Sequence, residues 1–125
     1  MSDIDELYQE QILEHYKHPK NKTRVLSGKG KTFANPGCGD TFCAQIIVSD
    51  GKVTSVTWTG EGCAVSSASM SMISQWLLGK TASELRGTNF ADLAKEVGLP
   101  NVLPAREKCV RMGWRLVEEA VLCYT

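Results

Sequence analysis

The sequence lacks most of the features that would place it outside the ordinary folded proteins. No apolar run among its 125 residues approaches the roughly 18 residues of a transmembrane helix. It has no net charge, because 14 Lys and Arg balance 14 Asp and Glu. This balance excludes a globally basic nucleic-acid binder and an acidic solubilising domain. The first residues, MSDIDELYQEQ, are acidic where a targeting peptide would be basic, so we expect a cytoplasmic protein without a membrane partner.

The sequence also lacks any C-x-x-C pair, which argues against thioredoxin-like redox chemistry and against zinc fingers. It nevertheless holds five cysteines, an odd number and more than a core of this size needs. Thiols stay reduced in the cytosol. The cysteines therefore indicate a metal site or sulfur chemistry rather than a disulfide framework.

The order of predicted elements indicates an α+β fold in one domain, residues 1–125. Asp50-Gly51 between two β-rich runs predicts a hairpin, and Thr81 with Glu84 predicts a capping box. Helical spacing and turn residues set the remaining bounds. The pattern predicts helices over 3–17, 64–78, 89–97 and 104–122, and strands over 31–34, 41–49 and 52–59.

Two further expectations concern side-chain faces and charge. In the hairpin, Val56 and Trp58 are expected on the face of Ile47, opposite Phe42 and Ala44. Charge is uneven, with five acids and no base in residues 1–16 and six bases and no acid in residues 17–39. The basic part includes a predicted mobile loop, 18–31. These stretches are either solvated faces or a docking surface for a partner of opposite charge.

Three cysteines lie where a thiolate is favoured or exposed. Cys38 follows Pro36 and Gly37 in a sharp turn, NPGCGD, with Asp40 two residues later. Cys63 stands at a strand-to-helix junction, where the positive end of the helix dipole favours thiolate. Cys109 lies in the first turns of the last helix, three residues after Arg106 and beside Lys108. For each of them, core packing or an incidental position is the alternative.

The other two cysteines are expected to be bystanders. Cys43 lies within a predicted strand, five residues from Cys38, which is a poor spacing for a chelate loop, so we expect it in the core. Cys123 is fourteen residues beyond Cys109, or roughly 21 Å along one helix, too far to share an ion. Three thiolates and the Asp40 carboxylate suit zinc, and thiolates also hold iron–sulfur clusters.

Four segments resemble the U-type iron–sulfur cluster assembly proteins, the IscU/SufU/NifU N-terminal family. They are LYQEQILEHYKHPKN at 7–21, NPGCGD at 35–40, GEGCAVSSASMSM at 60–72 and PAREKC at 104–109. The resemblance implies a SufE/NifU-like fold, a three-stranded antiparallel sheet with helices packed on it. It also implies that Cys38, Asp40, Cys63 and Cys109 are the metal or cluster ligands.

Two functions follow from the resemblance. In a SufU-like sulfurtransferase, zinc is held by the four ligands, Cys38 accepts persulfide sulfur from a SufS/IscS-like cysteine desulfurase, and Arg106 docks or stabilises a thiolate. In an IscU-like scaffold, Cys38, Cys63 and Cys109 hold a [2Fe–2S] cluster or iron, and Cys109 accepts the sulfur. Apo iron–sulfur proteins and chaperones are then further partners. A purely structural zinc protein is a third alternative.

The residues around the third cysteine bear on this choice. Lys108 stands where scaffold-type IscU proteins have a histidine, and Arg106-x-Lys108-Cys109 resembles SufU. SufU proteins usually carry an insertion between the second and third cysteines, and residues 64–108 are shorter than that branch leads us to expect.

Overall fold

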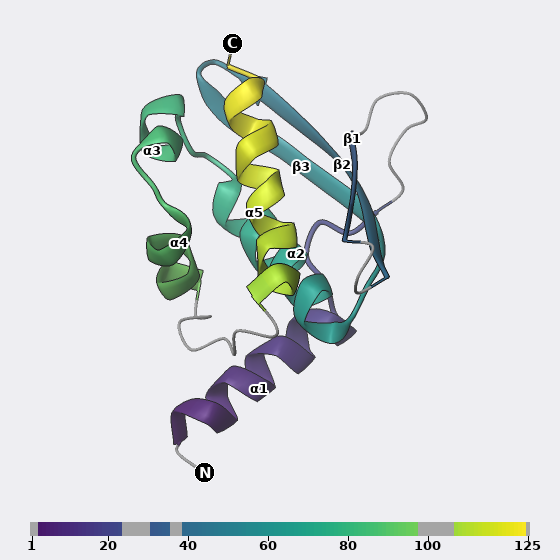
Figure 1. Ribbon diagram of the computed structural model, residues 1–125. Coiled ribbons are helices and arrows are strands. Elements are labelled where there is room, and N and C mark those ends of the chain that lie inside the picture. The colour runs from purple at the N-terminus through teal and green to yellow at the C-terminus, as the bar shows by residue number, and fades with distance from the viewer. Residues whose placement is uncertain (1–2, 24–30, 36–38, 98–106, 125) are drawn as a thin grey trace.

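The computed structural model describes residues 3–23, 31–35, 39–97 and 107–124. Its elements follow the predicted order, with one additional short helix (Figure 1). In chain order they are α1 (Asp3–Lys17), β1 (Lys31–Asn35), β2 (Asp40–Ser49), β3 (Lys52–Glu61), α2 (Ala64–Leu77), α3 (Ala82–Arg86), α4 (Phe90–Val97) and α5 (Glu107–Leu122). The α+β prediction is confirmed.

The sheet is antiparallel, with strand order β1-β2-β3. The predicted hairpin joins β2 to β3, and Asp50 and Gly51 have φ values of 54° and 77°. Positive φ at both central residues is the conformation that a two-residue hairpin requires, and Asp-Gly adopts it at low cost. This turn sets the pairing that brings Thr41, at the start of β2, opposite Glu61 at the end of β3.

The predicted faces of β3 are wrong, because the hairpin contains an irregularity. Val48 pairs with Val53, but Ile46 pairs with Val56, so the register shifts by one residue between Ile47 and Val48. A bulge adds one residue to a strand and reverses the alternation beyond it. Val56 and Trp58 are therefore buried on the core face, and it is Ile47 that points outward, 47% exposed.

Helices α2 and α5 cover the core face of the sheet (Figure 1). The two helices approach closely at Gly113, where a Cβ atom would lie 2.6 Å from Ile73 Cδ1. The Ser69 hydroxyl donates to the Val110 carbonyl at 2.6 Å across the same interface. Small residues at this crossing thus fix the first turn of α5 against the first turns of α2.

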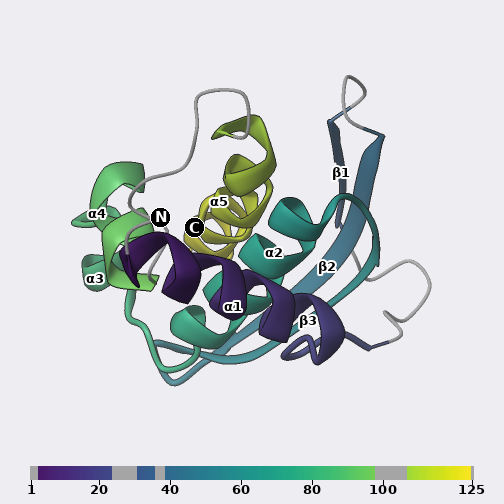
Figure 2. The same ribbon diagram turned by 90° about the horizontal axis from the view of Figure 1, so that it is seen from below.

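Helix α1 packs on α2, as the view from below shows (Figure 2). Ile12 is buried against Met72 and Val110. His15 Nδ1 lies 2.7 Å from the Ser71 hydroxyl. Burial, together with the charge of Lys20, lowers the pKa of His15.

The first part of the predicted mobile loop is fastened to the fold. The Trp58 indole donates to the Lys20 carbonyl at 2.8 Å, and the backbone N–H of Trp58 donates to Asn21 at 3.1 Å. Thr23 donates to the Trp58 carbonyl, so this segment pairs along the free edge of β3. Edge strands need such cover, because their unpaired backbone groups otherwise template association.

The described parts of the remaining helices agree with the sequence prediction. Thr81 and Glu84 form the predicted capping box, which begins the short helix α3. Helix α4 lies within the predicted range 89–97, and the described part of α5 begins at Glu107, so the predicted start at Pro104 lies outside the described residues. Across the described ranges, no helix is both long and apolar enough to cross a bilayer.

Candidate metal centre

Asp40 is a buried carboxylate at the start of β2. The antiparallel pairing of Thr41 with Glu61 places Asp40 beside the chain that leaves β3 and enters α2. Its side chain is 0% exposed, and Oδ1 accepts from the Cys63 backbone N–H at 3.1 Å and from the Ser66 hydroxyl at 2.9 Å. The sheet and the N-terminus of α2 therefore hold the carboxylate together.

Cys63 is the N-cap residue of α2. Its sulfur accepts from the Ser66 backbone N–H at 3.4 Å. Burial raises the pKa of the Cys63 thiol, but hydrogen bonds with Ser66 and Cys109 outweigh burial, so the net pKa lies below its ordinary value. The expectation of a thiolate-favouring position is confirmed, and the cap hydrogen bonds provide the cause.

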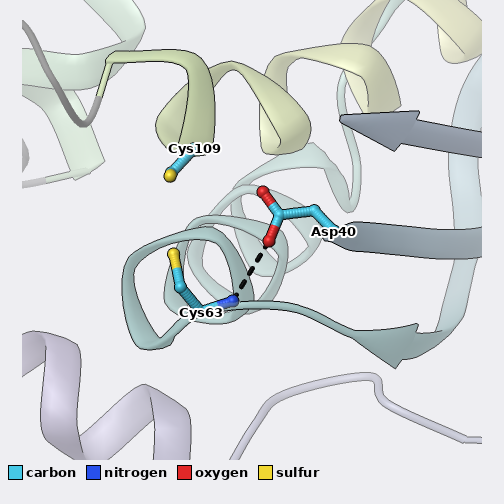
Figure 3. A group of neighbouring side chains, drawn as sticks. All are labelled: Asp40, Cys63 and Cys109. Atoms are coloured by element: carbon cyan, nitrogen blue, oxygen red, sulfur yellow. Dashed lines mark hydrogen bonds between the residues drawn. The ribbon is translucent and has the colours of Figure 1, made fainter. Parts of the chain in front are cut away.

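Cys109 occupies the described first turn of α5 and is 0% exposed. The contact between Ser69 and Val110 holds this turn against α2 and so brings Cys109 toward the N-cap of that helix. In Figure 3, the sulfurs of Cys63 and Cys109 and the carboxylate of Asp40 point toward one another. Three elements that are separate in sequence therefore meet at one point.

These three side chains form a compact donor set. One ligand atom from each of Asp40, Cys63 and Cys109 lies within 4.8 Å of the other two. Zinc accepts thiolate sulfur and carboxylate oxygen, and iron–sulfur clusters are held by thiolates. The donors fit a zinc ion by their chemistry, and their burial would exclude water from most of it.

The second carboxylate oxygen of Asp40 supports the same interpretation. Oδ2 is buried, and among the described residues no group donates a hydrogen bond to it. A buried carboxylate oxygen without a partner costs free energy that a bound cation would recover. Asp40 thus has one oxygen held by the protein and one available to a cation.

Two predicted site residues lie outside the described residues: Cys38 and Arg106. Lys108, the neighbour of Cys109, is exposed. Of the four ligands that the resemblance implies, the structure brings Asp40, Cys63 and Cys109 together.

The two predicted bystanders lie away from this group. Cys123 follows the end of α5, and its thiol donates weakly to the Ile46 carbonyl at 3.8 Å. Cys43 is half-buried between Phe42 and Ala44, which are both in the core, so its side chain points to the opposite face of the sheet. The prediction of core packing for Cys43 was wrong, because strand alternation allots the core face to its neighbours.

Sequence reasoning missed Ser66 and its contact with Asp40, although it did predict a close approach at Gly62. Ser66 is the third residue of α2, the position whose side chain and N–H face the N-cap residue. A Cβ at Gly62 would lie 2.5 Å from both Asp40 Oδ1 and Ser66 Oγ, so only glycine leaves room for their contact. The spacing of Ser66 from Cys63 was the available signal for Ser66.

Known proteins resemble this chain over nearly its full length. The zinc-dependent sulfurtransferase SufU of Bacillus subtilis is 30% identical, covering 96% of this chain and 92% of its own. The iron–sulfur cluster assembly enzyme IscU of Drosophila melanogaster is 33% identical, covering 94% and 78%. A nitrogen-fixing NifU-like protein (N-terminal) from Brucella abortus has the same fold, with a TM-score of 0.72, 22% identity and coverage of 98% and 95%.

The protein-family model described as the NifU-like N terminal domain matches residues 7–125 of this chain. This match includes the three described donors and the NPGCGD segment that contains Cys38. The chain therefore belongs to the family of NifU-like N-terminal domains.

Proposed function

We propose that this chain is an iron–sulfur cluster assembly protein that accepts sulfur from a cysteine desulfurase at a zinc site. The ligands of that site are Cys38, Asp40, Cys63 and Cys109. The observation that carries the proposal is the group of three buried or half-buried donors within 4.8 Å of one another. The name of the Bacillus subtilis relative, a zinc-dependent sulfurtransferase, supports it.

The chain's own residues divide the work of the site. Bound zinc keeps its cysteine ligands deprotonated and orders the segments that carry them. Asp40, Cys63 and Cys109 come from β2, the N-cap of α2 and the first described turn of α5, which are packed elements. Cys38 lies instead in NPGCGD, a sequence that predicts a turn, so we expect its departure to disturb the fold least.

The transfer step needs no net oxidant. If a group of the desulfurase took the place of Cys38 in the donor set, the Cys38 thiolate would be free to attack the terminal sulfur of the desulfurase persulfide. One S–S bond forms at Cys38, the S–S bond of the donor breaks, and the donor cysteine leaves as a thiolate. Arg106, three residues before Cys109, is assigned to docking or to stabilising a thiolate charge.

Metal analysis and desulfurase turnover test this function together. We expect about one zinc per chain in the purified protein and a stimulated rate of alanine release by a SufS/IscS-like desulfurase without added iron. Cys38→Ala should lose the stimulation, whereas Cys43→Ala, on the outer face of the sheet, should keep it. Unchanged stimulation in Cys38→Ala would exclude this mechanism, and stimulation lost equally in both variants would show nothing specific to Cys38.

The second candidate is a scaffold for a [2Fe–2S] cluster, with the cluster as cargo held by Cys38, Cys63 and Cys109. The similarity to the Drosophila melanogaster IscU, at 33% identity, favours it. Cys109 would then accept the sulfur, and Asp40 would be a non-thiolate ligand. Anaerobic reconstitution with iron and sulfide, followed by Mössbauer spectra and transfer to an apo iron–sulfur protein, tests it. A chain that neither holds nor transfers a cluster is not a scaffold.

The basic segment after α1 is the part we assign to desulfurase docking. Lys20 and Lys22 are exposed, while their backbone is fixed against Trp58, so the charges are presented from an ordered edge. Reversing the charge of Lys20, Lys22 and Arg24 should slow association with the desulfurase and flatten its salt dependence. Charge reversal at Lys52 in the hairpin is the control. Equal effects on association at both places would mean that the basic segment is a solvated surface and not a docking site.

A further inference from the structure

Ser66 is a buried serine that contacts two of the proposed ligands at once. Its hydroxyl oxygen lies 2.9 Å from Asp40 Oδ1, 3.1 Å from the Cys63 carbonyl and 3.4 Å from Cys63 Sγ. Its backbone N–H donates to Cys63 Sγ. The residue is 0% exposed, so water cannot replace these contacts.

The hydroxyl has only one proton for these three acceptors. The carboxylate oxygen is the closest of them and carries charge, and charge-assisted hydrogen bonds are the stronger ones. The proton therefore goes to Asp40 Oδ1, which already accepts the Cys63 N–H at 3.1 Å. Oδ1 is thus held by two donors, and Oδ2 by none among the described residues.

We propose that Ser66 is a positioning residue that makes Asp40 a ligand through one oxygen, Oδ2. The proposal rests on the proposed metal site and goes beyond it, because it assigns the two carboxylate oxygens to different partners. A free carboxylate can bind a cation through one oxygen or through both. Two protein donors on Oδ1 remove the second mode and fix the rotation of the carboxylate.

Gly62 makes this arrangement possible. A Cβ atom there would lie 2.5 Å from Asp40 Oδ1 and from Ser66 Oγ, within the hydrogen bond itself.

Loss of Ser66 leaves the Cys63 N–H as the remaining donor to Oδ1. The Asp40 carboxylate can then rotate in the metal-free protein. Its orientation must therefore be fixed when the metal binds, which weakens binding.

Zinc affinity and cobalt spectra of three serine and aspartate variants test the proposal. Zinc dissociation constants come from competition with a chromophoric chelator, and Co²⁺ substitution gives visible bands that respond to coordination. Ser66→Ala should weaken zinc binding by about 10- to 100-fold, the usual cost of removing an outer partner of a ligand, and should alter the cobalt bands. Asp40→Ala should weaken binding further.

Ser74→Ala is the matched control, because Ser74 is a fully buried, hydrogen-bonded serine on the same helix but bonds to Ser71 and Lys20 instead. We expect it to lower the unfolding midpoint as Ser66→Ala does, with zinc affinity and cobalt bands unchanged. Wild-type affinity and bands in Ser66→Ala would overturn the proposal. Wild-type affinity in Asp40→Ala would instead overturn the proposed ligand set, so the two failures are distinguishable.

A measurement on the unaltered chain keeps the proposal testable if Ser66→Ala does not fold. Zinc is added to protein labelled with ¹³C at the aspartate carboxyl groups, and the infrared difference spectrum is recorded. One-oxygen coordination widens the separation between the two carboxylate stretching bands, whereas two-oxygen coordination narrows it. Widening is the expected result. Narrowing would contradict the role of Ser66, whereas no change in the aspartate bands would contradict Asp40 as a ligand.

Discussion

The two ends of the α2–α5 pair each carry a cysteine, half-buried Cys63 at one end and exposed Cys123 at the other, and the pKa values of the two thiols are shifted in opposite directions. Burial raises the pKa at both Cys63 and Cys123. At Cys63 the hydrogen bonds from Ser66 and Cys109 reverse the effect, whereas the negative charge of Glu119 adds to it at Cys123. Local donors and charges, rather than depth, decide which thiol is suited to bind a cation.

The ends also differ in what surrounds the sulfur. One ligand atom each of Asp40 and Cys109 lies within 4.8 Å of the Cys63 sulfur. Cys123 lines a cavity of about 340 Å³ with Lys31, Glu119 and Leu122 among its other walls. One end gathers anionic donors at a helix N-terminus, and the other leaves a single thiol at a helix C-terminus, where the dipole disfavours negative charge.

The largest expected effect separates the two ends by metal binding. Cys63→Ser removes a proposed ligand and should weaken zinc binding by more than about 100-fold, beyond the usual cost of losing an outer partner. Cys123→Ser should leave zinc affinity within about twofold, because Cys123 is not part of the donor group and its thiol donates instead to the Ile46 carbonyl. Competition with a chromophoric chelator measures both constants. Equal losses of zinc affinity in the two variants would show that the two ends of the α2–α5 pair do not differ in metal binding.

A smaller effect follows from the packing around Gly62. Gly62→Ala places a methyl group between Asp40 and Ser66 and should cost about 1–3 kcal/mol in unfolding free energy through overpacking. Zinc affinity should fall by about 10-fold or more, since the same atoms position a ligand. Gly87→Ala is the control, because its Cβ would meet the Ser83 carbonyl at an ordinary 3.4 Å. Urea denaturation measures the unfolding free energies. An unchanged unfolding free energy in Gly62→Ala would show that Asp40 and Ser66 can move apart to accommodate the methyl group.

The smallest effect is a difference in the pH dependence of alkylation. In the metal-free chain, Cys63 should react with iodoacetamide at lower pH than Cys123, because thiolate is the reactive form and the two pKa values are shifted in opposite directions. Glu119→Gln should lower the pH at which Cys123 reacts, since it removes a repelling charge. Mass spectrometry of peptides after timed labelling gives both rates. A reversed order of reactivity would mean that burial outweighs the cap hydrogen bonds.

Local signals predicted most of the elements. The Asp50-Gly51 turn and the Thr81–Glu84 capping box both form as expected, because each depends on residues a few positions apart. The faces of β3 could not be predicted in this way. They depend on a register shift opposite Ile47, which is decided by pairing between strands and by burial of Trp58.

The sequence by itself determined which residues have metal-binding chemistry: Asp40, Cys63 and Cys109 were identified from their motifs, as was Cys38 in its turn. Only the tertiary structure decided that Asp40, Cys63 and Cys109 meet, because the meeting requires hairpin register to place Asp40 and close helix packing at Gly113 to place Cys109. It also decided that Oδ1 of Asp40 accepts two hydrogen bonds, whereas Oδ2 accepts none from the described residues. Motifs fix the type of donor, whereas packing between distant segments fixes which donors remain available.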